Sequence, residues 1–274
     1  MGDRMGEDQA KPRVPYASCP LCASENFGAI VRADCSKHPL FNPVVPSIIT
    51  WMRCHKCEHV FTDGTFSSDV LEIVFRKTHP NQEPGWDFER QRHISARMVE
   101  NVACHIKGGS WLDVGFGNGS LLFTAEEWGF SPVGLDLRAT SVEAMRKIGI
   151  EAHCCDLAEF RPETRFSVIS MADVLEHMRF PREGLKAAIR LLRPDGVLFL
   201  SMPNYGCAAW RLMDASRANP YWAELEHFHN FSRSRLYSLL EEEGCEPLQY
   251  RVSQRYRVCM EIVARRRMPA PEGA

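Results

Sequence analysis

Between Ser110 and Asn204 the chain alternates short apolar runs with segments of helical periodicity. The apolar runs are WLDVG, PVGLDL, IEAHCCDL, FSVISMADV and VLFLSMPN, and their lengths are those of strands. Strands that alternate with helices form βαβ units, and such units build a parallel sheet. This alternation predicts an α/β fold with its ligand site at the carboxyl ends of the strands.

Two more apolar runs, at 247–253 and 256–264, follow a predicted helix and are separated by a short turn. Strands joined by so short a connection run antiparallel. A further helix is predicted at 88–106, where apolar residues recur at helical spacing. Together these patterns predict a Rossmann-like, mostly parallel seven-stranded sheet that ends in an antiparallel C-terminal strand pair.

Four of the eleven cysteines form two C-x-x-C pairs, and these are Cys19, Cys22, Cys54 and Cys57. Two such turns supply the four soft ligands that tetrahedral zinc prefers. A nearby histidine could replace one ligand, but four cysteines already complete the coordination. We therefore expect a structural zinc ion in a small N-terminal module with four cysteine ligands.

The composition shifts along the chain divide it into five predicted segments. These are a flexible tail at 1–17, a zinc-ribbon-like module at 18–78, a linker at 79–92, the main domain at 93–267 and a flexible tail at 268–274. The N-terminus lacks the apolar core of a signal peptide, and no run approaches the roughly 18 apolar residues of a membrane span. We therefore expect a cytoplasmic protein.

The formal net charge is -2, and basic residues are spread along the chain except at 264–267. A nucleic-acid-binding domain usually carries a concentrated basic patch, so the charge pattern disfavours a nucleic acid partner. The sequence does not specify an oligomeric state.

The segment LDVGFGNGS at 112–120 places Gly115, Gly117 and Gly119 behind Asp113. A dinucleotide loop would need its third glycine one position later, and a phosphate loop would need a following Lys-Ser or Lys-Thr. A carboxylate would also repel a pyrophosphate, whereas it attracts a cation. The loop therefore favours S-adenosylmethionine, which carries an ammonium and a sulfonium group and no phosphate.

Asp136 ends the second predicted strand, where a carboxylate accepts hydrogen bonds from the hydroxyls of a ribose. Nicotinamide enzymes use the same arrangement, so Asp136 alone does not distinguish the two cofactors. A role as a helix N-cap is a structural alternative.

The motifs LDVGFGNGS, GLDL, CCDLAEF, MADVLEHM and LLRPDGVLFLSMPN occur in this order. Over residues 86–266 the chain thereby resembles the class I S-adenosylmethionine-dependent methyltransferases, especially their ubiquinone O-methyltransferase-like small-molecule subgroup. The N-terminal module resembles the zinc-binding region of sugar-nucleotide C-methyltransferases.

The resemblance implies methyl transfer to a small-molecule acceptor with an oxygen, nitrogen or carbon nucleophile, such as a sugar nucleotide or another biosynthetic intermediate. The alternatives are an RNA methyltransferase assisted by its zinc module and a non-catalytic module that binds S-adenosylmethionine.

The resemblance also implies how the cofactor is held. Asp113, Gly115 and Gly117 would contact the methionine end of the cofactor, and Asp136 would contact its ribose. Asp156 and Leu157 would flank its adenine. The predicted cofactor-binding residues are Asp113, Gly115, Gly117, Gly119, Asp136, Leu137, Asp156, Leu157 and Asp173. A turn residue is the alternative role for Asp156.

Methyl transfer needs an aligned nucleophile and a group that removes its proton. His177 follows the fourth predicted strand at the ligand-binding edge and is the first candidate for that base, with a structural role as the alternative. His227 and His229 are further candidates. They lie in the long, aromatic-rich connection 203–231, which is typical of a substrate lid or of a cover over the core.

Overall fold

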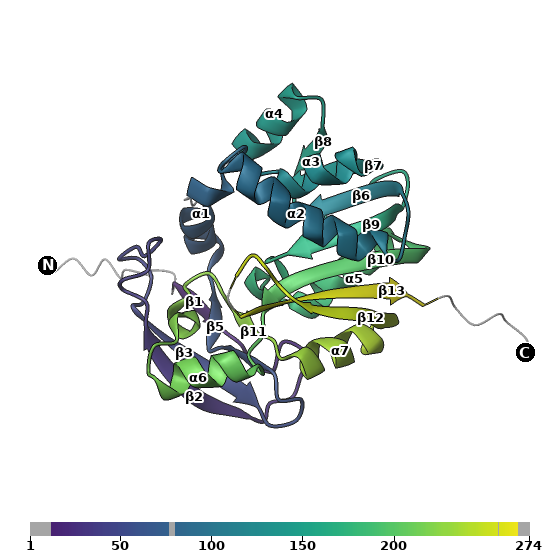
Figure 1. Ribbon diagram of the computed structural model, residues 1–274. Coiled ribbons are helices and arrows are strands. Elements are labelled where there is room, and N and C mark those ends of the chain that lie inside the picture. Colours follow the sequence, from purple (N-terminus) through teal and green to yellow (C-terminus); the bar gives the residue numbers. More distant parts are fainter. Residues whose placement is uncertain (1–11, 77–79, 257, 268–274) are drawn as a thin grey trace, which may run out of the picture.

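A computed structural model describes residues 12–76, 80–256 and 258–267 (Figure 1). The main sheet consists of β6 (Gly109–Val114), β7 (Phe130–Asp136), β8 (Glu151–Cys154), β9 (Phe166–Ala172), β10 (Leu192–Pro203), β12 (Cys245–Val252) and β13 (Cys259–Arg266). Around it lie α2 (Phe88–Ala103), α3 (Ser120–Glu127), α4 (Ala139–Lys147), the 3-10 helix η2 (Leu175–His177), α5 (Pro181–Leu191) and α7 (Arg233–Glu242).

The strand order is β12-β13-β10-β9-β6-β7-β8. The pairs β10–β9, β9–β6, β6–β7 and β7–β8 are parallel, whereas β13 is antiparallel to both β10 and β12. The predicted mostly parallel sheet with an antiparallel C-terminal pair is therefore confirmed.

Alternate residues of the central strands face opposite helical layers, because successive side chains of a strand point to opposite sides. Trp111 of β6 and Val168 of β9 pack in one cluster with residues of α2 and α3. Their neighbours Leu112 and Ile169 pack in another cluster with residues of α5 and α7. In Figure 1, α2 and α7 accordingly lie on opposite faces of the sheet.

The N-terminal module contains β1 (Arg13–Pro15), β2 (Phe27–Asp34), β3 (Ile48–Cys54), β4 (Val60–Thr62), β5 (Gly64–Phe66) and α1 (Ser68–Arg76), and the 3-10 helix η1 (Pro80–Gln82) lies in the predicted linker. β2, β3 and β4 form an antiparallel sheet, and β1 pairs with β5. β1 lies inside the segment predicted as an N-terminal tail. The predicted tail residues 1–11 and 268–274 lie outside the described residues.

The connection between β10 and α7 attaches the module to the main domain. It contains α6 (Ala208–Ala215), the 3-10 helix η3 (Pro220–Ala223) and β11 (His229–Asn230). β11 adds a fourth strand to the module's sheet by pairing antiparallel with β4. Leu225 and Phe228 enter the module's core, which also contains Trp51 and Phe66.

The module and this connection thus share one sheet and one core. None of the helices in the described ranges is long and apolar enough to cross a membrane.

Candidate active site

The parallel strands end at one edge of the sheet and bring the predicted acidic residues together. Asp113 in β6 stands opposite Gly134 of β7 and Ser170 of β9 in the strand register. Asp136 is the last residue of β7, and Asp173 directly follows β9. Three carboxylates that are distant in the sequence therefore meet around the glycine loop.

The glycine loop between β6 and α3 requires glycine for its backbone path. Gly115 and Gly117 have φ angles of 66° and 59°, in the left-handed region that side chains disfavour. A Cβ at Gly115 would lie 2.9 Å from Val174 Cγ2, whereas a Cβ at Gly117 would meet nothing closer than 3.9 Å. The backbone at Gly117 is thus open to close approach by a ligand.

Asp113 is buried beneath this loop, and Ser170 Oγ donates a hydrogen bond to its Oδ1 at 2.6 Å. Burial raises the pKa of the Asp113 carboxyl to about 7, although the hydrogen bond from Ser170 and the charge of Arg255 act in the opposite direction. A cationic ligand beside Asp113 would favour its ionised form.

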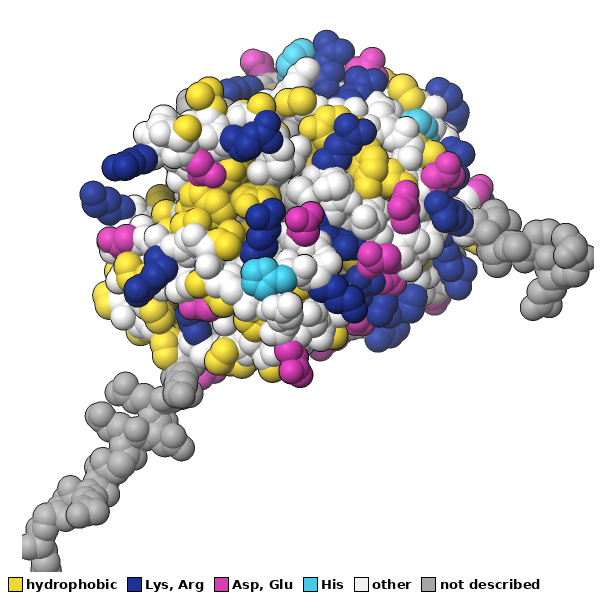
Figure 2. Space-filling model, turned by 90° about the horizontal axis from the view of Figure 1, so that it is seen from below, with side chains coloured by type: hydrophobic (Ala, Val, Ile, Leu, Met, Phe, Trp, Pro, Cys, Tyr) yellow, Lys and Arg dark blue, Asp and Glu magenta, His cyan; other side chains and the backbone are white. Residues whose placement is uncertain are grey.

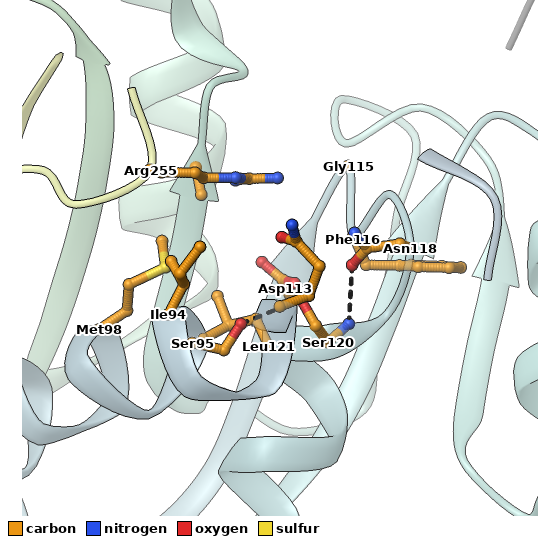
Figure 3. A pocket seen from close by; sticks show the side chains of 12 residues that line it. Ile94, Ser95, Met98, Asp113, Gly115, Phe116, Asn118, Ser120, Leu121 and Arg255 are labelled. Atoms are coloured by element: carbon orange, nitrogen blue, oxygen red, sulfur yellow. Dashed lines mark hydrogen bonds between the residues drawn. The ribbon is translucent and has the colours of Figure 1, made fainter. Parts of the chain in front are cut away.

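Arg255, in the loop between β12 and β13, is a site residue that the sequence analysis did not identify. Its guanidinium forms an ion pair with Asp173 Oδ2 at 3.1 Å. Figure 3 shows the side chain extending over a small cavity, on the side opposite Ile94 and Met98 of α2. No motif marks Arg255, and more than a hundred residues separate it from the glycine loop, so only the tertiary fold reveals it.

The cavity has a volume of about 20 Å³. It is lined by Gln91, Ile94, Ser95, Met98, Asp113, Gly115, Phe116, Asn118, Ser120, Leu121, Ala172 and Arg255. Because a single water needs roughly 10–15 Å³, a larger ligand group can enter only if some of these side chains move.

Asp136 accepts a hydrogen bond from Gly117 N at 3.3 Å, which ties the end of β7 to the glycine loop. Arg138 donates to both of its carboxylate oxygens, from Nε at 2.8 Å and from Nη2 at 2.7 Å. Arg138 also approaches Gln82 O in the segment before α2, at 3.4 Å. A ribose at Asp136 would therefore share or replace the hydrogen bonds of Arg138.

The other predicted cofactor residues have varied surroundings. Leu137 is exposed, whereas Leu157 is buried in the core beneath the sheet. Asp156 Oδ1 accepts a hydrogen bond from Ala158 N at 2.7 Å, as a turn residue does. Gly119 precedes α3 as its N-cap, with a φ of 79°.

A buried cluster of acidic and histidine residues lies beyond Asp173. Glu176 and His177 come from η2, and His227 comes from the connection before β11. The His177 and His227 ring centroids are 4.6 Å apart, and Phe228 N donates to Glu176 O at 2.9 Å. These contacts bring two predicted candidate bases together with an acid that the sequence analysis did not identify.

Burial and neighbouring ionisable groups shift the pKa values of the residues in and beside this cluster. Burial, together with the nearby Asp173, raises the pKa of Glu176 well above its ordinary value. Burial and the neighbouring His177 lower the pKa of His227 to about 3. Burial alone would raise the pKa of Glu224, but its hydrogen bond with His38 and the charge of His227 lower it to about 2.

His229 lies apart from this cluster, at the junction with the module. Its Nε2 is 2.9 Å from Met178 O, and its Nδ1 is 3.0 Å from His59 Nε2. Both ring nitrogens are therefore engaged, and burial lowers the pKa of His229 to about 3. This placement favours a structural role for His229.

The four cysteines of the two C-x-x-C pairs converge in the module. The Sγ atoms of Cys19 and Cys57 are 3.6 Å apart, as are those of Cys22 and Cys54, and all four lie within 4.8 Å of one another. Tetrahedral coordination with Zn–S bonds of about 2.3 Å places sulfur atoms about 3.8 Å apart. The donor set and its spacing fit a zinc ion.

Comparison with known families agrees with this geometry. The profile of a family described as a methyltransferase domain matches residues 86–250, more than half of the chain. The chain belongs to the class I S-adenosylmethionine-dependent methyltransferases. The matched range begins just before α2 and ends within β12. It includes the glycine loop, Asp136 and His177.

The methyltransferase is similar to two ubiquinone biosynthesis O-methyltransferases. It is 31% identical to that of Idiomarina loihiensis over 124 residues, which are 42% of this chain and 51% of the relative. It is 33% identical to that of Neisseria meningitidis serogroup C over 160 residues, which are 52% of this chain and 66% of the relative. The chain thus spans less than two thirds of the length of either relative.

Solved structures share the fold at low sequence identity. A 1,6-didemethyltoxoflavin-N1-methyltransferase from Burkholderia thailandensis, solved with S-adenosylhomocysteine bound, has a TM-score of 0.56 at 17% identity and covers 78% of this chain and 97% of its own. A magnesium protoporphyrin IX methyltransferase from Synechocystis PCC 6803 has a TM-score of 0.51 at 16% identity and covers 74% and 90%.

The raised pKa of Asp113 predicts a pH dependence of stability. Between about pH 4 and about pH 7 Asp113 keeps its proton in the folded protein but releases it in the unfolded chain. The contribution of Asp113 to the free energy of unfolding is therefore complete at low pH and is lost as pH rises. Its full size is about 4 kcal/mol. We therefore expect the free energy of unfolding of the cofactor-free wild type, measured with urea, to fall between pH 4.5 and pH 7.5 by about 2–4 kcal/mol more than that of Asp113→Asn. The exposed control Asp195→Asn should follow the wild type, and equal pH dependences of wild type and Asp113→Asn would contradict the assignment.

Proposed function

We propose that this methyltransferase transfers the methyl group of S-adenosylmethionine to a small molecule bound beside Glu176, His177 and His227. The observation that carries the proposal is the arrangement at the sheet edge. Arg255 lines one cavity with the glycine loop and Asp113, and it pairs with Asp173, which in turn interacts electrostatically with Glu176 and His177 of the acid–histidine cluster. A donor site and an acceptor site would thus be adjacent.

On the donor side, the ionised Asp113 would hold the ammonium group of the cofactor, and Arg255 would hold its carboxylate. Arg92 of α2 is a second arginine near this edge, but its Nε donates a hydrogen bond to Glu127 Oε1 at 2.8 Å. Asp136 would bind the ribose, while Leu137, Asp156 and Leu157 would border the adenine. The open backbone at Gly117 supports this placement, because it allows a ligand to come close.

The bound cofactor would supply an activated methyl group, and the protein would supply alignment and proton removal. The acceptor atom forms a bond to the methyl carbon as the bond from sulfur to that carbon breaks, and the acceptor loses its proton. We propose that His177 and His227 assist this proton loss, which their contact with each other and the interaction of His177 with Asp173 support. Such alignment is the main source of rate acceleration in displacement reactions.

The surroundings of the cluster support a small acceptor without phosphate groups at its reacting end. Glu224, whose lowered pKa favours its ionised form, lies beside His227 on the acceptor side, and a negative charge there would repel an RNA backbone. Basic and acidic side chains are also interspersed on the face drawn in Figure 2. The relatives are O-methyltransferases by name, which supports an oxygen nucleophile.

Transfer of a labelled methyl group from the cofactor to components of a small-molecule extract, followed by mass spectrometry, tests this function. The wild type should label at least one compound. His177→Ala should reduce the labelling rate by about 100-fold or more, as expected for loss of proton-transfer assistance, while its cofactor affinity measured by calorimetry stays unchanged. Asp113→Ala should weaken cofactor binding itself. Labelling by His177→Ala at the wild-type rate, or no cofactor binding by the wild type, would contradict the proposal.

We also propose that the four-cysteine group of Cys19, Cys22, Cys54 and Cys57 binds one structural zinc ion. Elemental analysis of the purified protein should find about one zinc per chain, and Cys54→Ala should lose the metal and unfold at lower temperature, because zinc binding contributes directly to folding. The exposed Cys104 provides the matched control, and Cys104→Ala should keep both properties. A folded wild-type protein without metal would refute this zinc site.

A further inference from the structure

We propose that Glu176, His177 and His227 bind a divalent transition-metal cation that holds the nucleophilic oxygen of the acceptor beside the methyl donor. This inference rests on the proposed function and specifies how its acceptor site works. The cation would be a second metal, separate from the zinc of the four-cysteine group.

The spacing of the three side chains fits a metal site. One carboxylate oxygen of Glu176 and one ring nitrogen each of His177 and His227 lie within 4.8 Å of one another. Two histidines and one carboxylate form the protein ligand set of many catalytic zinc and other first-row metal sites. Three protein ligands leave coordination positions open, so an acceptor oxygen can bind the same ion.

Buried polar atoms of Glu176 and His227 lack hydrogen-bond partners within the described residues. Glu176 is 1% exposed, and within the described residues neither of its carboxylate oxygens takes part in a hydrogen bond. His227 is 8% exposed, and its Nδ1 likewise has no hydrogen-bond partner there. Buried polar groups without partners are costly, and one cation between these atoms would satisfy both side chains.

The orientation of the His177 ring also fits a metal ligand. Its Nδ1 lies 3.0 Å from the carbonyl oxygen of Glu226. Donation from Nδ1–H to this carbonyl places the lone pair on Nε2 and fixes the ring orientation. Metal-binding histidines commonly use such a hydrogen bond from their other ring nitrogen to a carbonyl or carboxylate.

The local charge also favours a cation. Asp173, Glu224 and Glu226 surround the cluster in addition to Glu176, and Arg255 pairs with Asp173. The electrostatic interactions of Glu176 with both Asp173 and Glu224 raise the cost of its negative charge. A divalent cation at the cluster would reverse that cost, because it would attract each of these carboxylates.

The cation would activate the acceptor as a Lewis acid. Coordination lowers the pKa of a bound hydroxyl group, so its proton passes to water and the oxygen becomes a stronger nucleophile. The oxygen then forms its bond to the methyl carbon, and the bond from sulfur to that carbon breaks. In this step His177 and His227 would assist the loss of the acceptor's proton by holding the cation, rather than by accepting that proton themselves.

Cobalt binding to the full chain tests the site. The protein is first loaded with one equivalent of zinc at the four-cysteine group and is then titrated with Co²⁺ while visible absorption is recorded. We expect one further equivalent of Co²⁺ to bind without thiolate-to-cobalt charge-transfer bands. Glu176→Gln should weaken this binding at least 10-fold, and His227→Asn should do the same. The exposed residue Glu246 provides the matched control, and Glu246→Gln should bind as the wild type does.

Two further measurements distinguish a loss of metal binding from unfolding of the variant and from a failure of the proposed function. Thermal unfolding checks that each variant is folded, and added Co²⁺ should raise the unfolding temperature of the wild type but not that of Glu176→Gln. Calorimetry without cobalt checks cofactor binding. Absence of a second equivalent in the wild type, or equal cobalt affinity in Glu176→Gln, would overturn the metal site alone. A wild type that fails to bind S-adenosylmethionine would overturn the proposed function.

Discussion

The parallel pairing of β6 with β7 and β9 is the interaction on which the site depends. It places Asp113, Asp136 and Asp173 at one edge of the sheet, although they are separated by tens of residues in the sequence. A slip of one residue in a strand would turn its side chains to the opposite face. The core side chains on both faces therefore fix the register, and the register fixes the positions of the carboxylates.

The N-terminal module is part of the same construction. β11 completes its sheet, and His38 of the module is hydrogen-bonded to Glu224 beside the acid–histidine cluster. The connection that carries His227 is consequently held between the module and the main sheet. A zinc ion that stabilises the module would thereby also stabilise the geometry of the acceptor side, although the two Cys pairs are remote from the methyl-donor loop in the sequence.

Hydrophobic periodicity was sufficient to predict the sheet and its antiparallel C-terminal pair, and glycine spacing was sufficient to predict the loop at the end of β6, because these features depend on local pattern. Arg255 and Glu176 could not be found in this way, since their surroundings arise from tertiary contacts with Asp173 and the β10–α7 connection. His227 and His229 are only two residues apart, yet the pairing of β11 with β4 directs His229 to His59. Sequence spacing carries no information about that difference.

We expect the edge formed by β6, β7 and β9 to be the methyl-donor site. A crystal structure of the protein with S-adenosylhomocysteine would show whether the ligand binds there. The amino group of the ligand should lie at Asp113, its carboxylate at Arg255 and its ribose hydroxyls at Asp136, with Arg138 moved from its present hydrogen bonds. A ligand bound elsewhere, or a ribose that does not contact Asp136, would contradict this expectation.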